Sequence, residues 1–188
     1  MPQIAIKPLM KDTWADFEQL FGSKGAYGGC WCMWWRLSRK EFEQGQGEAN
    51  KHAMYSLVES GKIPGIILYK DNEPAAWCSV ARREDYAALE RSRLLKRREA
   101  HASWAIVCMF VGRKYRRQGL GLEIIKGAIQ YVKDQGGSLI EAFPTIPKSN
   151  NVPPVSSFMG FPELFSKAGF TEVAKVSPSR MIMEYHIA

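Results

Sequence analysis

The spacing of hydrophobic residues changes repeatedly between the two-residue period of strands and the longer period of helices. Strands are predicted where short apolar runs end at turn-forming residues, at residues 4–9, 63–69, 75–81, 104–111, 139–143, 171–176 and 181–187. Helices are predicted where apolar residues recur three and four positions apart, at residues 12–22, 48–60, 85–98, 119–135 and 162–168. This order predicts a mixed α+β protein, and residues 25–48 fit neither pattern.

One strand, one loop and one helix form the centre of the predicted fold. Residues 104–111, with the sequence WAIVCMFV, are all apolar, which is typical of a strand buried on both faces. A basic loop at residues 112–118 follows. The next helix, over residues 119–135, has its apolar residues on one face and ends at Gly136 and Gly137.

Composition limits the class of protein. The chain has 188 residues, of which 46% are hydrophobic and 24% charged, and this balance excludes a wholly disordered or fibrous chain. We find no internal repeat or linker, and we therefore expect a single domain over residues 1–188. The chain has neither a long apolar span nor a secretory leader pattern, so we expect a cytoplasmic protein that does not enter a membrane.

The net charge of +7 comes from one stretch of the chain. Residues 82–117 contain eleven basic and four acidic residues, so the remainder is neutral. Such a stretch attracts a polyanion, such as nucleic acid, acidic lipid or a phosphorylated cofactor, although residues 91–98 also fit a solvated helix face. The tryptophan cluster of Trp31, Trp34 and Trp35 lies outside the stretch, which argues against stacking on nucleic acid bases.

The four cysteines do not have the spacing of a metal site. Cys30 and Cys32 are closer together than the usual zinc knuckle, and no second ligand pair follows. Cys78 and Cys108 lie in apolar runs and are interpreted as small buried hydrophobic residues. We therefore expect reduced thiols and no bound metal.

The loop before the 119–135 helix has the features of a phosphate-binding turn. The first N–H groups of a helix lack partners, and the helix dipole places positive charge beside them. Gly119 and Gly121 allow an anion to approach the backbone, and Arg116 and Arg117 add charge. A P-loop is excluded because no Gly-Lys-Ser/Thr occurs, and a dinucleotide fingerprint would need glycine where Ile124 stands. The glycine pair alone also fits a simple tight turn.

At these residues the sequence resembles the GCN5-related N-acetyltransferases, the GNAT superfamily. Residues 116–121, RRQGLG, match the family's acetyl-CoA motif Arg/Gln-x-x-Gly-x-Gly/Ala, and residues 165–170, FSKAGF, are similar to its Tyr-x-x-x-Gly-Phe element. The resemblance implies a twisted, mostly antiparallel sheet of about seven strands, flanked by helices and splayed between its two central strands. It also implies direct acetyl transfer from acetyl-CoA to an amine, without a covalent enzyme intermediate.

The resemblance assigns coenzyme-binding roles to particular residues. The main chain of Phe110 and Val111 would bind the thioester and pantetheine arm. The pyrophosphate would bind the turn formed by Arg116, Arg117, Gln118, Gly119, Leu120 and Gly121.

The proton-transfer groups are less clearly marked in the sequence. The family often has a glutamate on the strand that corresponds to residues 104–111, and this strand has none. Glu141 on the adjacent strand is the best substitute for the base, with His101 second, although Glu141 also fits a structural role in which it is bonded to an arginine or to the backbone. Phe165 stands where the family tends to use a tyrosine to protonate the departing thiolate, so the thiolate is expected to take its proton from water.

The acceptor is not identified by the sequence. Trp31, Trp34, Trp35, Tyr27 and Arg36 lie where the family builds its acceptor wall, although the aromatic residues also fit simple core packing. A non-catalytic acyl-CoA sensor is the main alternative function. The oligomeric state stays open, with a homodimer among the options.

Overall fold

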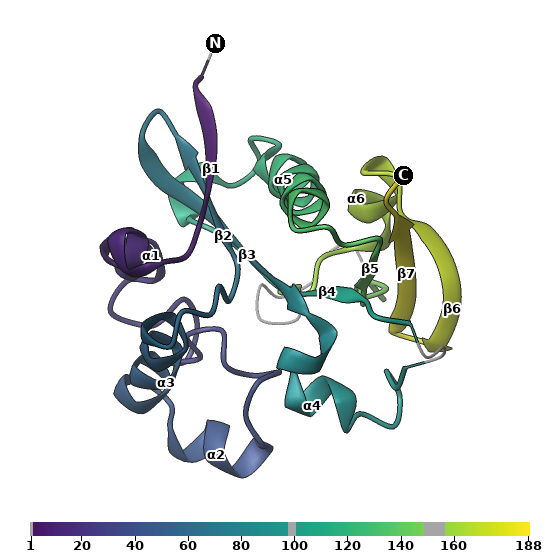
Figure 1. The fold of residues 1–188 in the computed structure, drawn as a ribbon, viewed down its shortest axis with the longest axis horizontal. Coiled ribbons are helices and arrows are strands. Elements are labelled where there is room, and N and C mark those ends of the chain that lie inside the picture. The colour runs from purple at the N-terminus through teal and green to yellow at the C-terminus, as the bar shows by residue number, and fades with distance from the viewer. Residues whose placement is uncertain (1, 98–100, 149–156) are drawn as a thin grey trace.

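The computed structural model describes residues 2–97, 101–148 and 157–188, and its helices and strands are drawn in Figure 1. The strands are β1 (Ile4–Pro8), β2 (Ile66–Lys70), β3 (Glu73–Arg82), β4 (Trp104–Val111), β5 (Leu139–Ala142), β6 (Thr171–Ser177) and β7 (Arg180–His186). The α-helices are α1 (Trp14–Phe21), α2 (Arg39–Gln44), α3 (Glu48–Glu59), α4 (Ala87–Glu90), α5 (Leu120–Asp134) and α6 (Pro162–Lys167). Short 3-10 helices are η1 (Lys11–Thr13), η2 (Arg83–Asp85) and η3 (Arg113–Tyr115).

The strands form one seven-stranded sheet in the order β1-β2-β3-β4-β5-β7-β6. Every neighbouring pair is antiparallel except β4 and β5, which are parallel. These two strands pair only between Trp104–Ile106 of β4 and Ile140–Ala142 of β5, so the second half of β4 has no strand on that side. The predicted fold class, including the splay between the central strands, is therefore confirmed.

Helices cover both faces of the sheet (Figure 1). Side chains alternate along a strand, so Ile66 and Leu68 of β2 pack with α5, whereas Ile67 and Tyr69 pack against α1 and α3. The hydrophobic core is therefore divided into two layers by the sheet. No helix in the described parts of the chain is both long enough and apolar enough to cross a bilayer.

Two predicted elements differ from the structure. The helix expected over residues 85–98 is limited to η2 and the single turn α4, because the buried guanidinium of Arg83 binds both Glu90 and the carbonyl of Leu95 and holds the chain in irregular turns. Residue 98 lies outside the described residues. The strand expected to be buried on both faces, β4, is buried over Trp104–Val107 and only partly buried over Cys108–Val111.

Helix α2 was not predicted, although its start has a recognisable sequence pattern. Ser38 accepts a hydrogen bond from the Glu41 amide, and the Glu41 carboxylate accepts one from the Ser38 amide at 2.8 Å. This reciprocal pair is a capping box, which the sequence Ser-x-x-Glu marks. The segment between α1 and α3 is thus partly helical.

Candidate functional site

A cavity of about 710 Å³ lies beside the open half of β4. One wall is formed by Cys108–Val111 of β4, and another by Phe161 and Leu164 at α6. Arg116 and Gly121 line it where the basic loop enters α5. The remaining wall comes from the segment between α1 and α3, with Tyr27, Cys30, Cys32, Trp34, Trp35 and Phe42. The segment without a predicted structure therefore builds much of the site.

On the side of β4 that lacks a strand, main-chain groups point toward the cavity. The Met109 amide points away from β3, since it donates to the Phe158 carbonyl at 2.6 Å. Backbone groups alternate along a strand, so the N–H of Val111 points to the same side and that of Phe110 toward β3. Phe110 instead contributes its ring to the cavity wall. Of the two residues predicted to use their main chain, only Val111 has it on the open side.

The turn before α5 presents a row of amides to the outside. Arg117 and Gly119 have φ of +61° and +79°, so the chain reverses just before the helix. The first backbone bonds of α5 are donated by Leu122 and Glu123 to the Gly119 carbonyl. In the described chain, no partner is found for the amides from Arg116 to Gly121. A helix of fifteen residues adds its dipole at this point, so the turn has the donors and the field that an anion needs.

The side chains of the turn differ in their surroundings. Arg116 lines the cavity and donates through Nε to the Val111 carbonyl at 3.2 Å. Arg117 is exposed. Gln118 is engaged in the turn itself, since it accepts from Lys70 and donates to the Lys114 carbonyl at 2.9 Å. Of the six residues predicted to bind the pyrophosphate, Arg116 and Gly121 line the cavity, and the other four lie between them in the turn.

Gly121 is at a point of close approach. A Cβ there would lie 3.0 Å from the Leu164 side chain of α6, which is tighter than an ordinary contact. Leu120 is buried and packs into the core beneath the turn, so its amide is the part available to a ligand. The glycine keeps the gap between α5 and α6 open.

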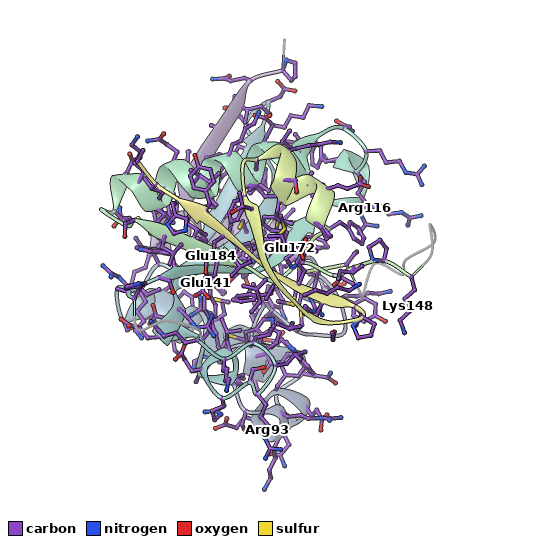
Figure 2. All side chains as sticks on the ribbon, turned by 90° about the vertical axis from the view of Figure 1, so that its right-hand side faces the viewer. Arg93, Arg116, Glu141, Lys148, Glu172 and Glu184 are labelled. Carbon is purple, nitrogen blue, oxygen red and sulfur yellow. The ribbon has the colours of Figure 1, made fainter. Side chains whose placement is uncertain are left out.

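Glu141 does not line this cavity. Both carboxylate oxygens accept from the Arg83 guanidinium at 3.0 Å, and Ser103 donates to one of them at 2.6 Å. The Glu141 residue is 5% exposed and the Arg83 residue fully buried. Figure 2 shows Glu141 in the interior, well apart from Arg116. The role of Glu141 as a base stays a prediction, and this geometry favours a structural ion pair.

The predicted acceptor residues are divided between cavity and core. Tyr27, Trp34 and Trp35 line the cavity. Trp31 is buried and stacks on Phe21 with ring centroids 5.7 Å apart. Core packing therefore explains Trp31. The other three residues are placed so that they can contact a ligand in the cavity.

Arg36 is used within the fold. Its guanidinium donates to the carbonyls of Pro64 at 3.0 Å and Asp85 at 3.4 Å, and it lies 4.4 Å from the Tyr86 ring centroid. It does not line the cavity. The Arg36 guanidinium is therefore not positioned to pair with the carboxylate of a ligand in the cavity.

The aromatic wall is held by glycines that pack closely. Gly29 has φ of +69°, and a Cβ on it would lie 2.3 Å from the Gly47 amide nitrogen. The Gly47 amide donates to the Gly29 carbonyl at 3.0 Å, and the Asn50 side chain donates to the same carbonyl at 3.2 Å. Because any side chain on Gly29 would clash with Gly47, this glycine fixes where the loop after α1 meets the loop before α3.

Three of the four cysteines, Cys30, Cys32 and Cys108, line the cavity, and all four are free thiols. Cys78 is fully buried away from it. Trp77 Nε1 donates to Cys32 Sγ at 3.2 Å. Within the described residues, no group of side chains suited to a metal ion is present.

The two remaining candidates of the sequence analysis lie outside the cavity. Phe165 is fully buried and packs edge-on against Phe170, with ring centroids 5.1 Å apart. His101 precedes β4 and is exposed, with its carbonyl accepting from Arg97 at 2.6 Å. Among the described residues that line the cavity, none is aspartate, glutamate or histidine.

The sequence over residues 31–153 matches the family model described as the acetyltransferase (GNAT) family. This match covers more than half of the chain, and the chain therefore belongs to the acetyltransferase (GNAT) family. No curated protein matches the sequence.

Solved structures share the fold at low sequence identity. The paia N-acetyltransferase of Thermoplasma acidophilum, in complex with coenzyme A, is 13% identical with a TM-score of 0.54, over 98% of this chain and 99% of its own. The structure of yncA from Salmonella typhimurium with its cofactor acetyl-CoA is 14% identical with a TM-score of 0.56, over 97% and 93%. Both similarities concern the fold.

Proposed function

We propose that this acetyltransferase moves the acetyl group of acetyl-CoA directly to an amine. The observation that carries the proposal is the row of unpartnered amides from Arg116 to Gly121, at the end of a cavity that also contains the open edge of β4. An anion fits these amides because they are donors at a helix start. The two solved structures with coenzyme A or acetyl-CoA support the choice of ligand.

The residues have separate tasks in this proposal. The amides of the turn and Arg116 hold the pyrophosphate, and the Val111 main chain aligns the pantetheine arm along β4. The cavity then orients the amine against the thioester, and this positioning supplies a large part of the rate enhancement. Donors fixed beforehand also stabilise the charge that develops on the carbonyl oxygen.

The acceptor in this proposal is an amine with an apolar or aromatic body. Tyr27, Trp34, Trp35 and Phe42 supply flat apolar surface. No carboxylate among the described lining residues is available to pair with a second ammonium group. An amine with one basic nitrogen therefore fits the wall better than a polyamine does.

A non-catalytic sensor of acyl-CoA is the second candidate. It is favoured by the absence of any carboxylate or imidazole on the described walls and by Phe165 at the family's tyrosine position. Both functions share the coenzyme site and differ in turnover.

Calorimetric titration with acetyl-CoA, followed by release of free thiol with a panel of amines, tests both candidates. Binding with turnover of an apolar amine supports the transferase. Binding without turnover of any amine favours the sensor. Failure to bind acetyl-CoA would contradict both.

A further inference from the structure

Acetyl transfer to an amine requires a proton acceptor in the cavity. The attacking nitrogen gains positive charge as the C–N bond forms and must lose a proton before the product is released. Apart from the cysteines, the titratable groups on the described walls are Tyr27 and Arg116, and residues 149–156, SNNVPPVS, contain no acidic residue or histidine. The search for a base therefore leads to the thiols.

Cys32 is surrounded by hydrogen-bond donors and positive charge. The Trp77 indole of β3 donates to its sulfur at 3.2 Å, and Cys108 of β4 lines the same cavity. Arg36 lies four residues further along the same segment, and its positive charge stabilises a negative charge on the sulfur. An indole and a guanidinium can only donate, so this environment favours sulfur in its anionic form.

The thiol pKa of Cys32 is shifted in the opposite direction from those of Cys30 and Cys108. Burial acts to raise the pKa of Cys32, but its interactions with Cys108, Trp77 and Ser79 and the charge of Arg36 lower the pKa to about 7. For Cys108, the hydrogen bond to Cys32 and burial raise the pKa, and burial also raises the pKa of Cys30. The other titratable groups that interact with the Cys32 sulfur are Cys78 from β3 and Tyr86 beyond η2.

We propose that the Cys32 thiolate is the proton acceptor of the transfer reaction. This inference rests on the proposed transferase function. The amine nitrogen attacks the thioester carbon, the C–N bond forms, the C–S bond breaks, and the coenzyme leaves as a thiolate. The N–H proton moves to Cys32 Sγ and passes from there to the coenzyme sulfur, so the enzyme returns to its starting state and no oxidant or reductant is needed.

The test compares Cys32→Ser with Cys78→Ala. Serine keeps the size of the side chain but does not ionise in the working range, whereas Cys78 is buried outside the cavity. We expect kcat of the wild type to rise with pH through about 7 and then level off, as a base with a lowered thiol pKa requires. Cys32→Ser should lose this rise and about 100-fold of kcat, with acetyl-CoA affinity unchanged. Cys78→Ala should keep the rise of kcat with pH, because the Cys32 thiol is still present.

If the Cys32→Ser variant does not fold, a measurement on the wild-type protein tests the same proposal. The rate at which iodoacetamide alkylates Cys32, followed by peptide mass spectrometry, should rise with pH over the same range as kcat, and acetyl-CoA should slow it. A Cys32 that reacts only at the higher pH of an ordinary thiol would overturn the proposal.

Three further outcomes are decisive. Wild-type kcat and pH profile in Cys32→Ser would remove Cys32 from the reaction but leave the transferase function in place. A stable acetyl group on Cys32 after incubation with acetyl-CoA alone would replace the proton role by a covalent one. Tight acetyl-CoA binding without turnover of any amine would overturn the transferase function together with the role of Cys32.

Discussion

The clearest result at the scale of single residues is the buried ion pair of Arg83 and Glu141. Burying two charges is costly. The cost is offset here because Nη1 of Arg83 donates to both Glu141 oxygens, Ser103 also donates to Glu141, and Nε of Arg83 donates to Glu90. The pair ties β5 to the chain that follows β3. Its removal should therefore change stability more than chemistry.

We expect Glu141→Gln to lower the free energy of unfolding by about 3–5 kcal/mol, because the Arg83 charge would remain buried without its partner. Urea unfolding measures this loss. The control is Glu184→Gln, since Glu184 is paired with Glu141 across β5 and β7, and its carboxylate forms an ion pair with the exposed His186. If Glu141→Gln kept full stability and lost turnover, Glu141 would be the base after all.

A second residue-scale prediction concerns Gly121. A valine there would crowd Leu164 and narrow the approach to the amides, so we expect acetyl-CoA affinity to fall by at least about tenfold with little change in stability. Calorimetry and thermal unfolding measure the two effects. Gly121→Ala is the graded control and should lose less. Gly119 is a poorer target because its φ of +79° would add backbone strain to any side chain.

At the scale of elements, the aromatic wall depends on how the loop after α1 crosses the loop before α3. Gly29 and Gly47 meet there through their backbones. The contact holds the residues that carry Tyr27, Trp34 and Trp35 against β4. The acceptor side is thus shaped by two glycines that do not touch a ligand.

Gly28 and Gly29 provide a matched pair of substitutions. Both have positive φ, +57° and +69°, but a Cβ on Gly28 meets nothing within 4 Å. Gly28→Ala should cost about 1 kcal/mol of unfolding free energy from backbone strain alone. Gly29→Ala should cost at least about 1–3 kcal/mol more, because it forces the two loops apart. Equal losses in urea unfolding would show that the crossing is not tight.

Most helices and strands could be predicted from the sequence, but the aromatic wall of the cavity could not. The pattern of residues 104–143 predicts β4, α5 and β5 well, because their apolar spacing is local. The residues around the sulfur of Cys32 come from three distant segments, and no spacing encodes such an arrangement. The capping box at Ser38 is the one local feature through which α2 could have been found.

At the scale of the whole molecule, the basic stretch is only partly available to ligands. Arg83 is buried in its ion pairs, Arg97 pairs with Glu90, and Lys114 pairs with Glu73. Arg116 and Arg117 remain at the turn before α5. The excess charge therefore serves partly to hold the fold and partly to attract an anion to one end of the cavity.

Substitutions at two exposed arginines test whether anion binding depends on the position of the charge. Arg116 lines the cavity, whereas Arg93, after α4, does not line it and lies well apart from Arg116 (Figure 2). Arg116→Gln should weaken acetyl-CoA binding by at least about 10-fold, because a hydrogen bond to a charged group contributes about 1.5–3 kcal/mol. Arg93→Gln removes the same charge and should leave the affinity unchanged. Equal losses in calorimetry would mean that the site responds only to overall charge.

The short pairing between β4 and β5 also gives the protein an internal reporter. The amide of Val111 faces the gap between these strands, whereas amides on the β3 side are held in the ladder. In deuterated solvent, the Val111 amide should exchange quickly in the free protein and slowly once pantetheine lies along the strand. Occupancy of the coenzyme site can therefore be followed at a single backbone position before any acceptor is known.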